Sequence, residues 1–250
     1  QPRTNIQNHK NFPSEGVNVS GACLSARWAT GIATATASHW SRALCGATHC
    51  RAVAVAVAAL VTDADLHEVV VPYGERCGNR TPCTLDIELK QPLRLPVFIY
   101  YELTNYHQNY RLYAKSRNQD QLEGEVVTSL AALSDCSPLD SVNHSSNVSN
   151  FYFPCGLIAW SQFNDTFELG ADTATNGTVS VPLRKHGIAW ESDRKMYSHD
   201  PGANITGVRV VPDITDEDFL VWMRVAAFPD FRKLYRVIDR DAAVEAGLGT

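Results

Sequence analysis

The sequence predicts a mainly β fold with short helical additions. From about residue 65, runs of β-branched and aromatic residues partly alternate with polar ones, which is typical of strands. Gly, Pro and Asn separate these runs, as expected for turns. With 250 residues and 44% hydrophobic content, the chain is long enough to bury one substantial core.

The first three predicted strands follow one another closely. They are "HEVVVPYG" at 67–74, "CTLDIELK" at 83–90 and "PVFIYYEL" at 96–103. The next segment, "NYHQNYRLYAKSRNQDQL" at 105–122, contains no Gly or Pro and suits a helix or an ordered loop. The strand pattern returns in "TVSVPL" at 178–183, "IAW" at 188–190 and "GVRVVP" at 207–212.

The segment 214–238, "ITDEDFLVWMRVAAFPDFRKLYRVI", fits two patterns. A helical face would join Phe219, Trp222, Met223, Ala226 and Ala227. An alternating strand would instead join Phe219, Val221, Met223 and Val225. Pro229 interrupts either element. Beyond it, "FRKLYRVI" predicts an amphipathic element covering the sheet with Phe231, Leu234, Tyr235 and Ile238.

Residues 1–64 differ from the rest, because they are rich in Ala, Thr and Ser and show no sustained period. We expect poor order there. The apolar run Ala52–Val61 is ten residues long, whereas a membrane-spanning helix needs about 20. The first residues also lack the pattern of a cleavable signal peptide. We therefore divide the chain into a poorly ordered or degenerate segment 1–64, a folded domain 65–240 and a short tail 241–250.

Composition excludes one class of partner and favours one compartment. The formal charge of -5 and the pI near 5.9 provide no basic surface for nucleic acid. Asn-X-Ser/Thr glycosylation sequons begin at seven of the 14 asparagines, where chance predicts about two, and this excess indicates passage through the secretory pathway. These asparagines are Asn18, Asn79, Asn143, Asn147, Asn164, Asn176 and Asn204.

The cysteines agree with an oxidising compartment, where disulfides form. Cys77 and Cys83 flank a short "GNRTP" turn, and Cys136 and Cys155 bracket a polar loop that contains two sequons. A bond between Cys136 and Cys155 would close a loop of about 20 residues and stabilise the fold by roughly 3 kcal/mol. Both pairings are hypotheses, and the alternative is buried free thiols.

The sequence indicates no catalytic residue, cofactor or metal. It contains no Gly-X-Ser-X-Gly elbow, Walker loop, His-Glu-X-X-His motif or dinucleotide glycine fingerprint. Asp216 and Asp218 resemble a glycosidase carboxylate pair, but acidic residues at a helix start more often complement the helix dipole and face water. Cys45, His49 and Cys50 offer three zinc ligands without a fourth, so we interpret them as incidental.

Four segments occur together in the order and approximate spacing of one family. They are "VFIYYELTNYHQNYRLYAKSRNQDQLEG", "PCGLIAWSQFND", "GIAWESD" and "EDFLVWMRVAAFPDFRKLY". In these segments the chain resembles the cell cycle control protein fifty family, also called ligand-effect modulator three. The resemblance runs from about Asp65 to Asp239.

This resemblance implies a noncatalytic accessory subunit of phospholipid flippases, the P-type ATPases that move aminophospholipids to the cytosolic leaflet. It implies two membrane helices around a glycosylated, disulfide-bonded, antiparallel β-sandwich-like ectodomain of α+β class. That ectodomain would be lumenal or extracellular, in the endoplasmic reticulum, Golgi or plasma membrane. The subunit would escort the ATPase from the endoplasmic reticulum, and it would meet membrane phospholipid only indirectly. The chain would then be a fragment, or altered near its ends, because a first helix is missing before residue 65 and a second after residue 250.

The sequence departs from the family pattern at two places. Family members commonly have Asn-Phe-Tyr-Gln-Asn-His-Arg where this chain has "NYHQNYR", so His107 and Tyr110 stand at exchanged aromatic positions. Trp160 stands where an asparagine is usual, which places a large indole at a small polar site.

The matched motifs supply candidate scaffold and partner-binding residues. Tyr100, Tyr101, Tyr106, Tyr110 and Tyr113 can bury their rings while each hydroxyl stays hydrogen-bonded, and nearby carboxamides can satisfy irregular backbone. Arg111, Lys115 and Arg117 can pair internally or meet acidic loops of a partner. For Trp190 and Trp222 we expect core packing. The candidates for contact or scaffold are Tyr101, Asn105, Gln108, Asn109, Arg111, Arg117, Trp222, Arg224, Arg232 and Tyr235.

Two other functions stay open from the sequence. The first is a secreted carbohydrate-binding or carbohydrate-processing β-sandwich, because exposed aromatic and acidic residues also suit sugars. The second is a truncated family member without a working partner.

Overall fold

The structure is a computed structural model, and it describes two parts of the chain. The first is the backbone of three short strands, Arg3–His9, Val17–Gly21 and Cys23–Leu24. The second is residues 67–247 without 79, 81, 91, 174–176 and 198. The zinc-ligand candidates Cys45, His49 and Cys50, the apolar run Ala52–Val61, and the sequons at Asn79 and Asn176 lie outside the described residues.

One sheet has five strands built around β6, Val97–Leu103. The side chains of β6 alternate between buried and half-buried along the whole strand, because successive side chains of a strand point to opposite faces. Its antiparallel neighbour is β11, Phe231–Ile238, which pairs Phe231 with Leu103 and Ile238 with Val97. The order is β11-β6-β2-β4, with β3 also paired to β6; here β2 is Val17–Gly21, β3 is Cys23–Leu24 and β4 is Val69–Val71.

A second sheet has four antiparallel strands in the order β5-β1-β8-β9. These are β5 (Cys83–Glu88), β1 (Arg3–His9), β8 (Thr166–Thr173) and β9 (Gly177–Ser180). A two-residue parallel pair joins β10 (Val208–Arg209) to β7 (Tyr152–Phe153). None of these sheets closes into a barrel among the described residues.

The described helices are all short, at most seven residues. Helices of this length are unstable alone, so tertiary packing holds them. The α-helices are α2 (Tyr73–Cys77), α3 (Arg111–Lys115), α4 (Gln119–Leu122), α5 (Leu157–Trp160), α6 (Glu191–Met196), α7 (Glu217–Met223) and α8 (Arg240–Glu245). The 3-10 helices are η2 (Leu130–Cys136), η3 (Val142–His144), η4 (Val148–Asn150) and η5 (Gly202–Asn204).

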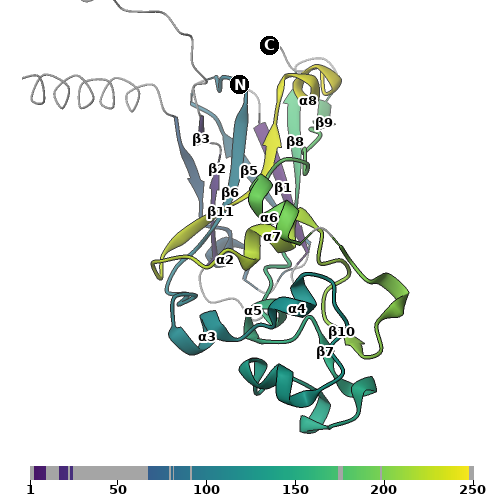
Figure 1. Cartoon of the computed structure of the whole chain (residues 1–250). Helices are drawn as coiled ribbons and strands as arrows, with labels where there is room; N and C mark the ends of the chain where they lie inside the picture. Colours follow the sequence, from purple (N-terminus) through teal and green to yellow (C-terminus); the bar gives the residue numbers. More distant parts are fainter. Residues whose placement is uncertain are drawn as a thin grey trace, which may run out of the picture.

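The strands of both larger sheets lie in one half of the molecule, while α3, α4 and α5 lie below them (Figure 1). One main core includes buried side chains of β6, β8, β11 and α7. Aromatic rings link its parts, since Tyr101 stacks on Phe163 at 3.9 Å between ring centroids and Phe167 meets Tyr235 edge-on at 5.1 Å. A smaller core surrounds Cys136 and Cys155 in the segment that leads to β7.

The structure shows a mixed α and β fold with small antiparallel sheets. The strands predicted at 83–90 and 96–103 are confirmed as β5 and β6. The segment 105–122 contains α3 and α4, as predicted for a helix or ordered loop. The strands predicted at 67–74, 178–183 and 207–212 are confirmed only over the shorter spans of β4, β9 and β10.

Two predictions from the sequence are wrong. Residues 188–190 form no strand, because a buried glutamate binds their backbone instead of a neighbouring strand. The segment 231–238 is not an amphipathic element that covers the sheet; it is strand β11 of the sheet itself, and Lys233 lies on its buried side. Poor order in residues 1–64 stays a prediction, because the structure describes only the backbone of β1, β2 and β3 there, and these strands pair with strands of the main domain.

Candidate partner-binding surface

Two loops far apart in sequence, 104–110 and 225–230, are joined by hydrogen bonds. The carboxamide of Asn109 donates to the carbonyl of Ala227 at 2.9 Å, and the oxygen of Gln108 accepts from the backbone N–H of Ala226 at 2.9 Å. These two side chains satisfy irregular backbone, as predicted. Asn105 acts differently: its φ is 56°, and its backbone N–H donates to Asp230 at 2.8 Å.

The tyrosines of this region form a buried network with the core. The ring of Tyr106 lies edge-on to Tyr113, Trp222 and Phe231, with centroids 5.6 to 6.2 Å away. The hydroxyl of Tyr113 lies 2.6 Å from that of Ser161. Burial raises the pKa of Tyr113 well above its ordinary value, so the phenol stays protonated. The motif therefore builds a rigid polar scaffold.

Four of the predicted contact residues are in the interior. The exposed fractions of Tyr101, Gln108, Trp222 and Tyr235 are 4%, 0%, 1% and 6%. The indole N–H of Trp222 donates to the carbonyl of Ile158 at 2.8 Å, and the Tyr235 hydroxyl accepts from the N–H of Phe167 at 3.0 Å. The prediction that Trp222 packs in the core is therefore confirmed. These four residues serve the scaffold and present no surface to a partner.

The exposed candidates differ in how their charges are paired. Arg224 bonds to Asp193, with its Nε 3.1 Å from Oδ2. Arg232 bonds to Glu102 at 2.8 Å and to Glu68. Arg111 lies exposed on α3 and has no hydrogen-bond or ion-pair partner among the described residues. It is therefore able to form new charge-assisted bonds.

Arg117 is half-buried between α3 and α4. Burial raises the pKa of the nearby Tyr197, and the positive charge of Arg117 partly opposes that rise. Arg117 thus acts electrostatically within the fold.

Exposed apolar side chains flank Arg111 along the chain and also occur on the loop joined to it, and the sequence did not reveal them as a surface. Tyr110 and Leu112 are 61% and 65% exposed, and Phe228 on the joined loop is 73% exposed. We call Tyr110, Arg111, Leu112 and Phe228 the α3 surface. The sequence alone does not indicate that these residues belong together, because the two loops are joined only in the folded chain, through the bond between Asn109 and Ala227.

A cleft with a volume of about 640 Å³ lies beside this loop pair. Trp190, expected to pack in the core, is instead 65% exposed and lines the cleft. The guanidinium of Arg224 lies 4.9 Å from the centroid of the indole ring, within range of a cation–π interaction. Tyr100, Val221, Val225 and Leu234 also line the cleft.

Trp160, at the position where the family has asparagine, also lies at the surface. It is 39% exposed, and its ring meets that of Tyr152 edge-on with centroids 4.8 Å apart. The large indole is accommodated because much of it projects to solvent.

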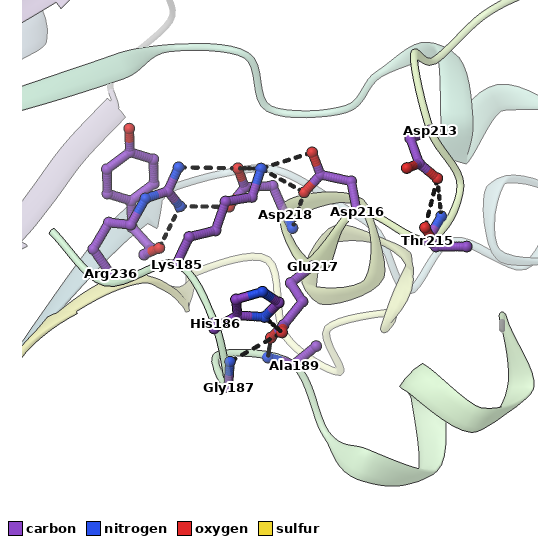
Figure 2. Close-up of polar contacts among 11 residues, drawn as sticks. Lys185, His186, Gly187, Ala189, Asp213, Thr215, Asp216, Glu217, Asp218 and Arg236 are labelled. Carbon is purple, nitrogen blue, oxygen red and sulfur yellow. Dashed lines mark hydrogen bonds and ion pairs between the residues drawn. The ribbon is translucent and has the colours of Figure 1, made fainter. Parts of the chain in front are cut away.

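A network at the start of α7 holds the segment that leads to Trp190 (Figure 2). Glu217 is 6% exposed, and its carboxylate accepts from the backbone N–H groups of Gly187 at 3.0 Å and Ala189 at 2.9 Å. Burial alone would raise the pKa of Glu217, but these two bonds and His186 together lower it below its ordinary value. Sequence reasoning missed Glu217, since nothing local distinguishes it from its acidic neighbours.

Asp216 and Asp218 are occupied by structural contacts. Asp216 accepts from the backbone N–H of Asp218 at 2.9 Å and so caps α7, as expected for acidic residues at a helix start. Lys185 bonds to both carboxylates, and Arg236 bonds to Asp218 (Figure 2). This arrangement stabilises the start of α7 and engages both carboxylates in ion pairs.

Lys233 fixes the other end of α7. Its ammonium donates to the carbonyls of Val221, Trp222 and Arg224 at 2.9, 2.8 and 2.5 Å. These carbonyls have no partner within the helix, so the lysine satisfies them. Burial, and to a lesser extent the positive charge of Arg224, lowers the pKa of Lys233 to about 7.

The disulfide predictions are confirmed, because the structure contains Cys77–Cys83 and Cys136–Cys155. The described sequon asparagines Asn143, Asn147, Asn164 and Asn204 are all exposed. Among residues 67–247 that the structure describes, no group of three or more His, Cys, Asp or Glu side chains could hold a metal ion.

Residues 49–249 match the model of the LEM3 (ligand-effect modulator 3) family, also described as the CDC50 family. The chain belongs to this family. The resemblance predicted from the four motifs is thus confirmed.

Several curated relatives of this LEM3/CDC50 member are similar to it. ALA-interacting subunit 3 of Arabidopsis thaliana is 38% identical over 68% of this chain and 48% of its own length. Cell cycle control protein 50A of Bos taurus is 33% identical over 75% of this chain and 60% of its own. The phospholipid-transporting ATPase accessory subunit CRF1 of Saccharomyces cerevisiae is 36% identical over 63% of this chain and 42% of its own length. The chain spans about half the length of the curated relatives it matches. No helix among the described residues has both the length and the apolar character to cross a bilayer.

Proposed function

We propose that this chain is a noncatalytic accessory subunit of a phospholipid-transporting P-type ATPase. It escorts and supports that ATPase, and so contributes to phospholipid asymmetry and vesicle trafficking. The observation that carries the proposal is membership of the LEM3/CDC50 family, one of whose members is named as such an accessory subunit. The ATPase binds the lipid, and this subunit meets membrane phospholipid only indirectly.

We also propose that the folded domain is lumenal or extracellular, at the membrane of the endoplasmic reticulum, Golgi or plasma membrane. Two disulfides support an oxidising compartment. Exposure of the described sequons supports N-glycans on them. The proposed glycan acceptors are Asn79, Asn143, Asn147, Asn164, Asn176 and Asn204.

We further propose that the two larger sheets pack as a β-sandwich. The contact between Tyr235 of β11 and Phe167 of β8 supports this arrangement, because it joins the two sheets through both a ring contact and a hydrogen bond. The stacked pair of Tyr101 on β6 and Phe163 just before β8 adds to it.

The α3 surface is our candidate for contact with the ATPase. Arg111 has no partner among the described residues; Tyr110 and Leu112 beside it in the chain are exposed, and so is Phe228 on the loop that Asn109 binds. Aromatic and arginine residues dominate the energy of protein interfaces, so this composition suits an association site.

Co-expression of the chain with the P-type ATPases of its own organism tests the proposed accessory function and the proposed contact through the α3 surface. We expect the wild-type chain to co-purify one ATPase, and Arg111→Ala to weaken that association by up to about 2 kcal/mol. Arg94→Ala is the control, because Arg94 is also exposed but precedes the opposite end of β6. Recovery of no ATPase by the wild type would reject the function, whereas equal recovery by both variants would reject the α3 surface alone.

A further inference from the structure

Trp190 and Arg224 form an exposed pair that the fold holds in place. Trp190 directly precedes α6, and Arg224 directly follows α7. The guanidinium lies over the indole at 4.9 Å and also binds Asp193 of α6 through two nitrogens, at 3.1 and 3.4 Å. Since 65% of Trp190 remains exposed, the pair presents a large aromatic surface to solvent.

The backbone beneath this pair is fixed from two sides. Glu217 binds the N–H groups of Gly187 and Ala189, immediately before Trp190. Lys233 binds the carbonyl of Arg224 at 2.5 Å. An aromatic side chain on a fixed backbone loses little entropy when it is covered by another molecule, and such preorganisation favours binding.

The adjoining cleft has a volume of about 640 Å³ and is lined by apolar and by charged residues. The apolar ones include Val221, Val225 and Leu234. Each charged side chain of its lining already has a partner. Asp193 pairs with Arg224, Glu191 with Lys195, and Arg232 with Glu102 and Glu68. The ammonium of Lys233 is satisfied by three carbonyls.

This internal pairing determines which ligand fits. An ionic ligand would have to displace a partner that is already in place, and a sugar would need polar groups that the lining has already engaged. An uncharged apolar side chain would displace only water from Trp190, Val225 and their neighbours. Exposed tryptophan and arginine beside an apolar pocket are also the residues that dominate protein interfaces.

We infer that the cleft beside Trp190 receives uncharged apolar side chains from a loop of a partner protein. This inference rests on the proposed function, under which the loop belongs to the exoplasmic side of the ATPase subunit. Val225 and Ala226 line the cleft, and the next residue, Ala227, is bound by Asn109 just before α3, so that the two surfaces are linked through this segment.

The first test compares two exposed tryptophans in the full chain co-expressed with the ATPase. We expect Trp190→Ala to weaken recovery of the ATPase about tenfold, as for an interface anchor. Trp160→Ala, which removes the other exposed indole, should leave recovery unchanged. Matching melting temperatures of Trp190→Ala and wild type would exclude a folding defect.

The second test identifies what occupies the cleft. A photo-crosslinking benzoylphenylalanine replaces Val225, and mass spectrometry identifies the attached species. A peptide of the ATPase supports the inference, whereas a glycan or a lipid overturns it. Because the occupant is apolar, the loss of recovery caused by Trp190→Ala should be the same at low and at high sodium chloride; a loss that shrinks as salt is raised would contradict an apolar contact.

The two proposals fail in different ways. If the wild-type chain recovers no ATPase, the proposed function is wrong. If the wild type recovers the ATPase and Trp190→Ala, correctly folded, recovers as much, only the assignment of the cleft is wrong.

Discussion

Single buried polar residues decide the local structure around the candidate surface. Glu217 is the clearest case, because one carboxylate binds two backbone N–H groups of a segment 28 to 30 residues earlier. No strand or helix satisfies those groups, so the glutamate replaces regular structure there.

We predict that Glu217→Gln lowers the free energy of unfolding by about 1–3 kcal/mol, because Gly187 and Ala189 bind different oxygens of the carboxylate and glutamine replaces one of these oxygens with an NH2 group, which cannot accept. Chemical denaturation measures this. Since the folded-state pKa of Glu217 is lowered, its stabilisation is complete above the ordinary value of 4.5 and is lost as the pH falls through the folded-state pKa. The control is Glu191→Gln, whose side chain is 71% exposed against 7% for Glu217. Equal effects of the two variants would contradict the assigned role.

At the scale of elements, short helices depend on close backbone contacts. Gly156 begins α5 with φ of 103°, and a Cβ atom there would overlap the carbonyl oxygen of Ser116. Ser116 in turn accepts from the backbone N–H of Leu157 through its hydroxyl at 3.0 Å. Glycine at 156 therefore lets α5 dock against the end of α3.

We predict that Gly156→Ala costs at least about 2 kcal/mol of stability, because strain in φ and overlap with backbone add together. Gly177→Ala is the matched control: Gly177 also has positive φ, 70°, but a Cβ there meets nothing within 4 Å. Thermal unfolding compares the two. A smaller loss for Gly156→Ala than for Gly177→Ala would show that the overlap relaxes.

One disulfide lies in the main core, and the other secures a segment with only a small core of its own. Cys136–Cys155 joins residues 19 apart and lies in the smaller core with Leu133 and Phe151. We predict that replacing both cysteines by serine costs about 3 kcal/mol in the chain-entropy model. The same change at Cys77–Cys83, which joins residues 6 apart, should cost about 2 kcal/mol. Denaturant unfolding of the two double variants checks this order.

For the whole molecule, Lys233 links global stability to pH near neutrality. An unfolded lysine keeps its proton up to about pH 10.5, whereas folded Lys233 releases it near pH 7. Between these values the unfolded chain binds more protons, so the free energy of unfolding should rise with pH. We predict that this rise between pH 7 and 9 shrinks in Lys233→Met. Lys195→Met, at a side chain 75% exposed, should keep it. Parallel profiles for wild type and Lys233→Met would refute the assignment.

The sequence predicted those strands in which apolar and polar residues alternate along the strand itself. β6 is predictable because its buried and half-buried side chains follow the period of two. β11 was predicted to be an amphipathic element covering the sheet, because Lys233, whose side chain lies on the inward face, interrupts the alternation of apolar residues. Trp190 could not be placed from sequence, since its exposure depends on Glu217 and Arg224, which lie about 30 residues away.

The candidate surface shows the same limit. Carboxamides at 108 and 109 were predicted to satisfy irregular backbone, and they do, but the backbone they bind lies 118 residues further along the chain. The sequence showed which groups needed partners; only the folded chain shows that Gln108 and Asn109 bind Ala226 and Ala227.

The pairing of β6 with β11 also constrains how the chain matures. Glu102 meets Arg232 across a separation of 130 residues, so the edge of β6 that pairs with β11 stays unpaired until late in synthesis, although β2 and β3 precede β6 in the chain. During translation that strand would remain an open template for aggregation. Nascent chains of this protein should therefore depend on chaperones for much of their time on the ribosome.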